Sequence, residues 1–318
     1  PVLASLRFLT GWLSPLSYEY SETMNKSVPG VLRRPSWKYR FGLTEDPNVL
    51  TGATTRNPSA NESVSYNLGS GFSFLGGIVT TVGYKTSISR DVIKAFGDKL
   101  ERTSTSWPTV TLRISKFKHF PLIKSQLNWF IDIFSPRTGF SRQISEDANL
   151  DRGFLTKRNE TISRNPVLSL NLKLFRSFSV SGSYTVNKST AETYSSTTGV
   201  LQTETRTTDK KIAVTSQYKF SAPGGIALPL FGRLKFKSQV DIDVNIAFNS
   251  NLIETSSNGT PFVTTTDKSF FSVSPRISYS FSQQIKGGLT GRWQDNTDTK
   301  FNKKSHTREI QIWTEIRF

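Results

Sequence analysis

Asp241 and Asp243 are the acidic residues whose spacing best suits chemistry. They stand two residues apart in a stretch of alternating character, so an extended backbone would place both on one face. Two carboxylates on one face can bind a hard cation such as Ca²⁺. They can equally form ion pairs across neighbouring strands, with Lys235, Lys237 or Arg276 as partners. We expect the ion pairs, and we predict neither a metal site nor a cofactor.

The two histidines do not form a recognisable catalytic set. His119 stands in a short basic turn and His306 in or beside a long polar loop, which places them at opposite ends of the expected elements. Nucleophilic catalysis needs a base beside the nucleophile. The chain has no cysteine, which excludes a thiolate nucleophile, a disulfide framework and a zinc ribbon. We therefore predict that the protein is not an enzyme.

Basic residues are spread along the chain. There are 41 Lys and Arg against 24 Asp and Glu, a net charge of +17. Nucleic-acid-binding proteins gather such charge in one patch or helix, so we expect no nucleic-acid partner. If these basic residues line the wall of a barrel, they would attract anions or acidic proteins. Alternatively, they would only solvate the wall and balance the charge of lipid head groups. The residues that we expect to face a water-filled interior are Lys38, Arg40, Lys85, Arg113, Lys235, Lys237, Asp241, Asp243, Arg276, Lys286 and Arg292.

The elements that hold these residues are predicted to be strands, because the period of the sequence is two nearly everywhere. From Leu234 to Asn249, one set of alternate positions is almost entirely apolar and the other is polar. Trp313 interrupts the polar side of the last strand. Helices are expected only at 3–13 and 91–101. Strands are expected at 16–22, 35–43, 62–74, 76–88, 106–117, 124–135, 166–175, 177–189, 208–220, 233–250, 268–282, 284–296 and 305–318, with a further one near 153–164, so that they number 12 to 14.

The connections between these strands alternate in length. This rhythm predicts an up-and-down meander with short turns at one rim and long loops at the other. Residues 1–318 would form one domain, with 1–15 as a linker or the tail of a preceding element. The short turns are expected at 74–76, 118–121, 176–177, 221–232 and 283–284, and the long loops at 44–61, 89–105, 136–165, 190–207, 251–267 and 297–304.

The strand lengths favour a membrane protein. The expected strands run to 18 residues, whereas ~5–6 residues are usual in soluble sheets and ~9–11 cross an outer membrane. Aromatic residues such as Trp37 and Trp293 gather toward strand ends, as interfacial girdles require. We therefore predict an all-β, antiparallel up-and-down transmembrane β-barrel in the bacterial outer membrane, in contact with its lipid. Ile316 and Phe318 would form a C-terminal assembly signal. A soluble secreted β-protein that binds glycan or nucleic acid is the alternative from another class.

Several phrases of the sequence, in order, resemble the C-terminal part of the SprA/Sov family, the giant outer-membrane translocon of type IX secretion and gliding motility. Together they extend over most of the chain from about residue 34 onward. The phrases are RPSWKYRFGL at 34–43, SWP at 106–108, NPVLSL at 165–170, LPLFG at 228–232, SPRISYSFS at 274–282, GG at 287–288 and REI at 308–310.

The resemblance implies a barrel close in size to the largest known, which has ~36 strands. It also implies passage of cargo proteins to the cell surface, and association with partner lipoproteins and a plug subunit. The family offers no catalytic residues. Because 12 to 14 strands make only about a third of such a wall, we expect this chain to be the C-terminal wall of a larger barrel. A self-contained porin or substrate channel of 12 to 14 strands is the alternative.

Overall fold

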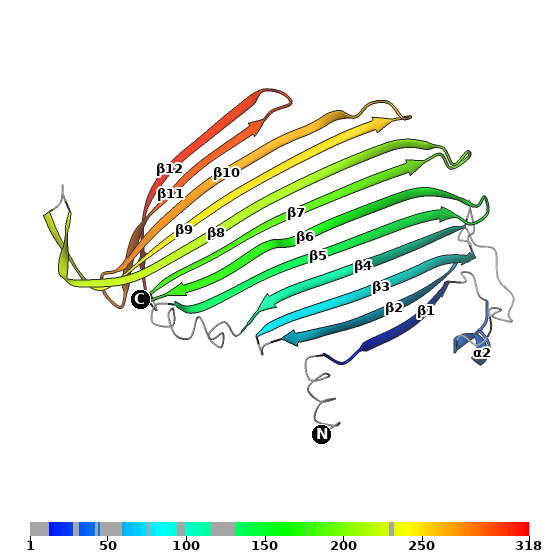
Figure 1. Cartoon of the computed structure of the whole chain (residues 1–318), viewed down its shortest axis with the longest axis horizontal. Helices are drawn as coiled ribbons and strands as arrows, with labels where there is room; N and C mark the ends of the chain where they lie inside the picture. The colour runs from blue at the N-terminus through cyan, green and yellow to red at the C-terminus, as the bar shows by residue number, and fades with distance from the viewer. Residues whose placement is uncertain are drawn as a thin grey trace, which may run out of the picture.

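The chain folds into one curved antiparallel sheet, in which each strand is hydrogen-bonded to its neighbours in the sequence (Figure 1). This computed structural model describes residues 13–27, 32–41, 44, 59–74, 77–93, 99–115, 131–175, 177–228 and 232–317, without the side chains of 26–27, 59, 74, 92–93, 222–228 and 232–237. The strands are β1 (Ser17–Ser27), β2 (Ser59–Phe74), β3 (Ile78–Ile93), β4 (Leu100–Ile114), β5 (Ile131–Asn149), β6 (Phe154–Leu174), β7 (Phe178–Tyr194), β8 (Leu201–Leu228), β9 (Gly232–Ser257), β10 (Val263–Ser280), β11 (Ile285–Asp298) and β12 (Lys303–Ile316).

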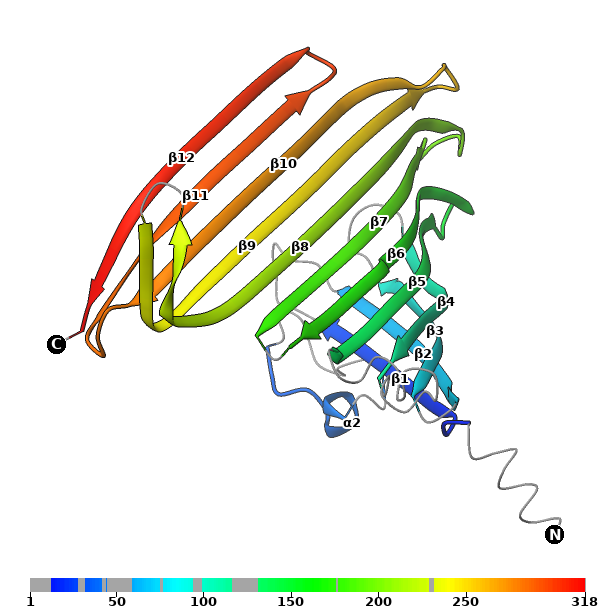
Figure 2. The same cartoon turned by 60° about the vertical axis from the view of Figure 1, so that its left-hand side comes forward.

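The two edge strands do not meet. Within the described residues, β1 is paired only with β2 and β12 only with β11. Figure 2 shows these two strands at opposite sides of the curved sheet. The predicted all-β, up-and-down antiparallel fold is confirmed, and it is consistent with a β-barrel, although the sheet is not closed.

The sheet has almost no hydrophobic core. Among the described residues, the buried hydrophobic side chains are those of Ala60, Ile131 and Val240. Extensive contacts between described elements join consecutive strands only, so the described residues form no second layer on either face of the sheet. The fold is therefore held together by backbone ladders and by contacts between side chains on neighbouring strands.

A short helix replaces the centre of the strand predicted at 35–43. Trp37–Arg40 form the single turn α2, because the Ser36 hydroxyl accepts a hydrogen bond from the Tyr39 backbone N–H at 3.3 Å and caps the turn. In the described part of the chain, no helix is long and apolar enough to cross a membrane.

Most of the predicted long loops are wrong, because strands extend into them and close in tight turns. β5 continues to Asn149 and β6 begins at Phe154, which leaves 150–153 for the turn. Gly153 has a φ of 76°, which glycine adopts without strain. These segments carry polar residues on both faces, so the alternation of hydrophobicity ends while the backbone ladder continues. Turns at 195–200, 258–262 and 299–302 likewise replace most of the loops predicted at 190–207, 251–267 and 297–304.

The described chain holds twelve strands, the lower end of the predicted range. β6 unites the strand predicted at 166–175 with the further one near 153–164. The helix predicted at 91–101 is wrong at both ends, because residues 91–93 belong to β3 and residues 100–101 to β4, while 94–98 lie outside the described residues. The helix predicted at 3–13, the turn at 118–121 and most of the strand at 124–135 lie outside the described residues. The division of 1–318 into one domain with a tail at 1–15 stays a prediction.

Candidate functional site

An apolar face runs across the sheet from strand to strand. In β9, Val240, Ile242, Val244, Ile246 and Phe248 project to one side, and their partners in the ladders project with them. On β10 those partners are Tyr279, Ile277, Pro275, Val273 and Phe271. We call this continuous stripe the apolar band, and its members on other strands include Leu68, Val82, Val110, Leu170, Val180, Val214, Leu289 and Ile312.

Most of the apolar band is not covered by the described residues, although Val240, at its end on β9, is only 3% exposed. In the middle of the sheet, Tyr218 and Ile277 are each 41% exposed, and on β12 Ile312 is 84% exposed. Burial of apolar surface is worth ~25 cal/mol per Å², and soluble monomers rarely expose apolar patches larger than a few hundred Å². A band with members on ten of the twelve strands is therefore a surface for lipid or for another protein.

Aromatic side chains border the apolar band at both ends. Toward the 149–154 hairpin, the rings of Tyr20 and Tyr66 lie 5.2 Å apart and those of Tyr84 and Trp107 lie 6.0 Å apart. Phe248, Phe271 and Trp293 occupy this border on β9 to β11. At the other border Phe178 contacts Tyr218, and Tyr279 contacts Phe281. Between Val240 and Phe248 the band spans nine residues of β9, and ~9–11 tilted residues cross a bilayer.

We call the aromatic border nearer the 149–154 hairpin the upper aromatic border. Beyond it, the same face of the sheet carries charged side chains in ion pairs. The Arg142 guanidinium lies 2.7 Å from a carboxylate oxygen of Glu160, and Arg158 lies 3.3 Å from Glu146. These cross-strand pairs were not predicted, because Arg142 and Glu146 fall in the loop predicted at 136–165, and no pairing was predicted for the further strand near 153–164 that holds Arg158 and Glu160. The signal available in the sequence was the repetition of opposite charges at alternate positions, as in Arg158 and Glu160.

A second ionic group lies in the β11–β12 hairpin. Asp295 accepts a hydrogen bond from Arg308 at 2.7 Å and lies 2.7 Å from Nδ1 of His306. These two contacts hold the pKa of the Asp295 carboxyl below its usual range. In the β7–β8 hairpin, by contrast, the hydrogen bond from Tyr194 to Glu192 raises the pKa of Tyr194 to about 12.

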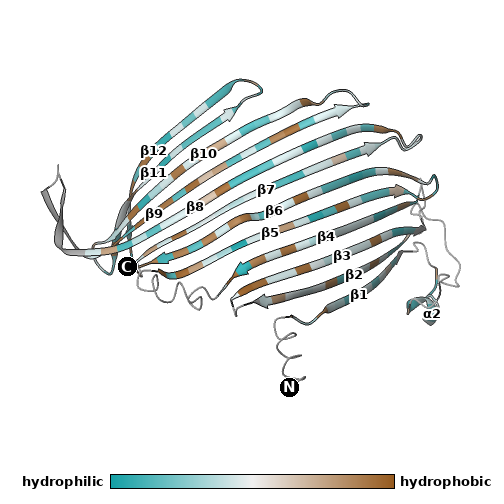
Figure 3. Ribbon diagram, viewed as in Figure 1, coloured by the Kyte–Doolittle hydropathy of each residue, from teal (hydrophilic) through white to brown (hydrophobic). Residues whose placement is uncertain are grey.

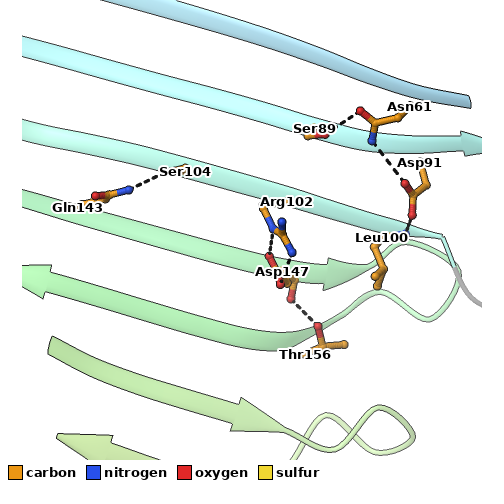
Figure 4. A network of polar contacts seen from close by, with 9 residues as sticks. All are labelled: Asn61, Ser89, Asp91, Leu100, Arg102, Ser104, Gln143, Asp147 and Thr156. Atoms are coloured by element: carbon orange, nitrogen blue, oxygen red, sulfur yellow. Dashed lines mark hydrogen bonds and ion pairs between the residues drawn. The ribbon is translucent and has the colours of Figure 1, made fainter. Parts of the chain in front are cut away.

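The opposite face, which we call the polar face, carries hydroxyl, amide and charged groups that hydrogen-bond from strand to strand (Figure 4). Arg102 of β4 donates two hydrogen bonds to the Asp147 carboxylate of β5, at 2.8 and 3.2 Å. Gln143 donates to the Ser104 hydroxyl at 3.1 Å. Figure 3 shows the resulting alternation of hydrophilic and hydrophobic residues along the strands.

Three hollows open on the polar face, with volumes of about 870, 540 and 370 Å³. The smallest is lined by residues of five successive strands, from Ile133 of β5 to Asp243 of β9. Side chains from five strands can converge on one hollow only where the sheet bends toward that face. The polar face is therefore concave in this region.

The ladder register places seven of the residues predicted to face a water-filled interior on the polar face. These are Lys85, Arg113, Asp241, Asp243, Arg276, Lys286 and Arg292. Lys235 and Lys237 belong to β9, but their side chains lie outside the described residues. The strand placement of Lys38 and Arg40 is wrong, because both stand on α2 and on neither face of the sheet. Ile316 of the predicted assembly signal is exposed, and Phe318 lies outside the described residues.

Trp313, the exception on the polar side of β12, stacks with Arg276 of β10. The guanidinium carbon lies 4.7 Å from the centre of the indole ring. The two side chains reach each other over Gly288 of β11, where a Cβ would lie 2.9 Å from the indole and 2.1 Å from the Ile277 carbonyl oxygen. Asp243 stands directly opposite Arg276 in the ladder, but no described cationic group lies within 4.0 Å of the carboxylate of Asp243 or Asp241, so the ion pair predicted with Arg276 is wrong. Asp241 instead accepts a hydrogen bond from Gln239.

Replacing Gly288 with alanine is expected to destabilise the folded sheet by ~1–3 kcal/mol, because the new Cβ would overlap the neighbouring strand. Urea unfolding of the protein in lipid vesicles measures this free energy. Gly182→Ala is the matched control, since a Cβ there would meet its nearest atom, on Val214, at an ordinary 3.7 Å. Equal stability of the two variants would contradict the close packing at Gly288.

No catalytic or metal cluster emerges within the described part of the chain. His119 lies outside it. His306 belongs to β12, not to a loop, and no serine or threonine hydroxyl among the described residues hydrogen-bonds to its ring. The described residues contain no group of three or more His, Asp or Glu side chains suited to a metal ion. The expectation that the protein is not an enzyme stays a prediction.

A curved antiparallel sheet with an uncovered apolar band on one face and a polar opposite face is consistent with the wall of a β-barrel. No protein-family model matches the chain, and no curated protein is significantly similar to it. The resemblance to the SprA/Sov family therefore stays a prediction.

Proposed function

We propose that the chain is a membrane-spanning wall of a bacterial outer-membrane β-barrel, with its apolar band against lipid and its polar face against water. The observation that carries the proposal is the uncovered band, which has aromatic borders and gives way to ion pairs on the same face. In lipid, only a sheet whose backbone groups are paired is stable, and the continuous ladder from β1 to β12 supplies that pairing.

More specifically, we propose that this wall is the C-terminal part of a SprA/Sov-like translocon, which passes cargo proteins to the cell surface. The sequence phrases given above support this assignment. Within the described residues the outer edges of β1 and β12 have no partner strand, which supports it as well, because each such edge would need a further strand in lipid. The passage would be passive, with partner lipoproteins and a plug subunit controlling it, and the role in type IX secretion and gliding motility would follow.

Cell fractionation tests the membrane assignment. We expect the full-length protein to sediment with outer membranes, to resist alkaline extraction, and to change its gel mobility on boiling. Recovery from the aqueous fraction without detergent would favour the soluble, glycan- or nucleic-acid-binding alternative. Loss of the protein should also trap surface cargo inside the cell, whereas unchanged delivery of surface proteins would contradict the secretion role.

Whether β1 pairs with β12 distinguishes a wall of a larger translocon from a self-contained porin. A porin of this chain alone would require β1 to pair with β12, which the described sheet does not show. Disulfide cross-linking tests this pairing in a panel of double variants, each with one cysteine introduced in β1 and one in β12. The sequence contains no cysteine of its own that would interfere. We expect no intrachain disulfide in the membrane-embedded protein. Efficient disulfide formation at neighbouring pairs would favour the porin.

A further inference from the structure

Four cations lie together on the apolar side of the sheet, just beyond the upper aromatic border. Arg142 of β5 and Lys188 of β7 occupy one row, since each stands opposite Ile162. Arg164 of β6 and Lys210 of β8 occupy the row below, since each stands opposite Val186. Side chains on adjacent strands in adjacent rows are diagonal neighbours, so each of the four cations lies diagonally beside the next, and their long side chains can reach a common ligand.

Three of these four cations have no acidic partner. No carboxylate among the described residues lies within 4.0 Å of Arg164, Lys188 or Lys210, and all three residues are exposed. Arg142 is the exception, with Glu160 at 2.7 Å. Cations on neighbouring strands that have no acidic partner repel each other, and a bound anion would relieve that repulsion.

The cluster is local to four strands. The same two rows continue onto β9 and β10 through Ser250 and Ser269 below and through Leu252 and Asp267 above, and none of these is a cation. Immediately below the cations lie Leu168, Tyr184 and Ile212 of the apolar band. The site thus combines a cationic head with an apolar surface directly beneath it.

We propose that Arg142, Arg164, Lys188 and Lys210 bind the phosphate head group of an anionic membrane lipid, whose acyl chains lie on the apolar band. This inference rests on the proposed membrane-spanning wall. The positive charge of the four side chains favours an anionic ligand. Phosphate is suitable, since arginine binds phosphate oxygens bidentately and lysine binds them as a point charge. The apolar band directly below the four cations favours a lipid phosphate over free phosphate, because the acyl chains of a lipid can lie on the band.

The experiment compares lipid retention by the full-length protein in vesicles of phosphatidylcholine and phosphatidylglycerol mixed at a ratio of four to one. After mild detergent extraction, native mass spectrometry counts the lipids of each kind that remain bound. The test variant is Arg164→Gln with Lys188→Gln and Lys210→Gln. The matched control removes the same charge from the polar face by Lys157→Gln, Lys211→Gln and Lys219→Gln. We expect the test variant to lose affinity for phosphatidylglycerol by about tenfold or more, and the control to keep it.

Each other outcome overturns the inference. Equal losses in the two variants would show an effect of net charge alone, and an unaltered test variant would show that the cluster holds no lipid. Enrichment of added inorganic phosphate in place of lipid would assign the site to a soluble anion. In these cases the protein still enters the bilayer, so the proposed wall stands. Failure of the unmodified protein to enter the bilayer would overturn the wall and the lipid site together.

Discussion

Single cysteines along β9 are expected to react with a charged maleimide at rates that alternate with residue number. Ile242→Cys and Ile246→Cys would place the thiol in lipid, whereas Asp243→Cys and Asn245→Cys would place it in water. Moving a charged group into the bilayer costs ~3 kcal/mol, so the reagent should label the first pair about a hundredfold more slowly. The chain contains no other cysteine, so labelling of intact cells reports each position directly.

The control for this alternation is the same set of variants after denaturation, where all four thiols should react equally. Equal labelling in the intact membrane would show that both faces of β9 contact water, as in a soluble sheet. Protection of Asp243→Cys and Asn245→Cys together with labelling of Ile242→Cys would place lipid on the polar face, and either result would contradict the proposed orientation.

The centres of most strands could be predicted from the sequence, whereas their upper ends could not; β5 is an exception, because its centre lies in the loop predicted at 136–165. Around Val244, hydrophobic and polar residues alternate, and this alternation fixes both the strand and its two faces. Above the aromatic border both faces are polar, as around Arg158 in β6, so the sequence loses its period while the strand continues. The sequence therefore predicts the position of the apolar band more accurately than it predicts the end of a strand.

The face of the sheet on which a residue lies could be predicted from its odd or even position in the strand. The side-chain contacts between neighbouring strands could not be predicted in this way. Arg276 and Lys286 fall on the polar face because of their position in alternating strands. Trp37–Arg40 alternate in the same way and yet form a helical turn, because the Ser36 cap decides a segment this short. The contact between Arg142 and Glu160 depends on the register of two strands, and no local pattern specifies it once hydrophobic alternation is lost.

Val244→Arg is expected to cost ~2–4 kcal/mol of folding free energy in a bilayer, because Val244 lies midway between Val240 and Phe248, near the centre of the apolar band. The measurement is urea unfolding in phospholipid vesicles, together with the fraction of protein that changes gel mobility on boiling. Asn245→Arg is the control: it adds the same charge one residue along on the polar face, where water solvates it, so its stability should stay within ~0.5 kcal/mol of the unmodified protein. A smaller loss for Val244→Arg than for Asn245→Arg would mean that the band does not face hydrocarbon, because a charge placed in hydrocarbon must cost more than the same charge placed in water.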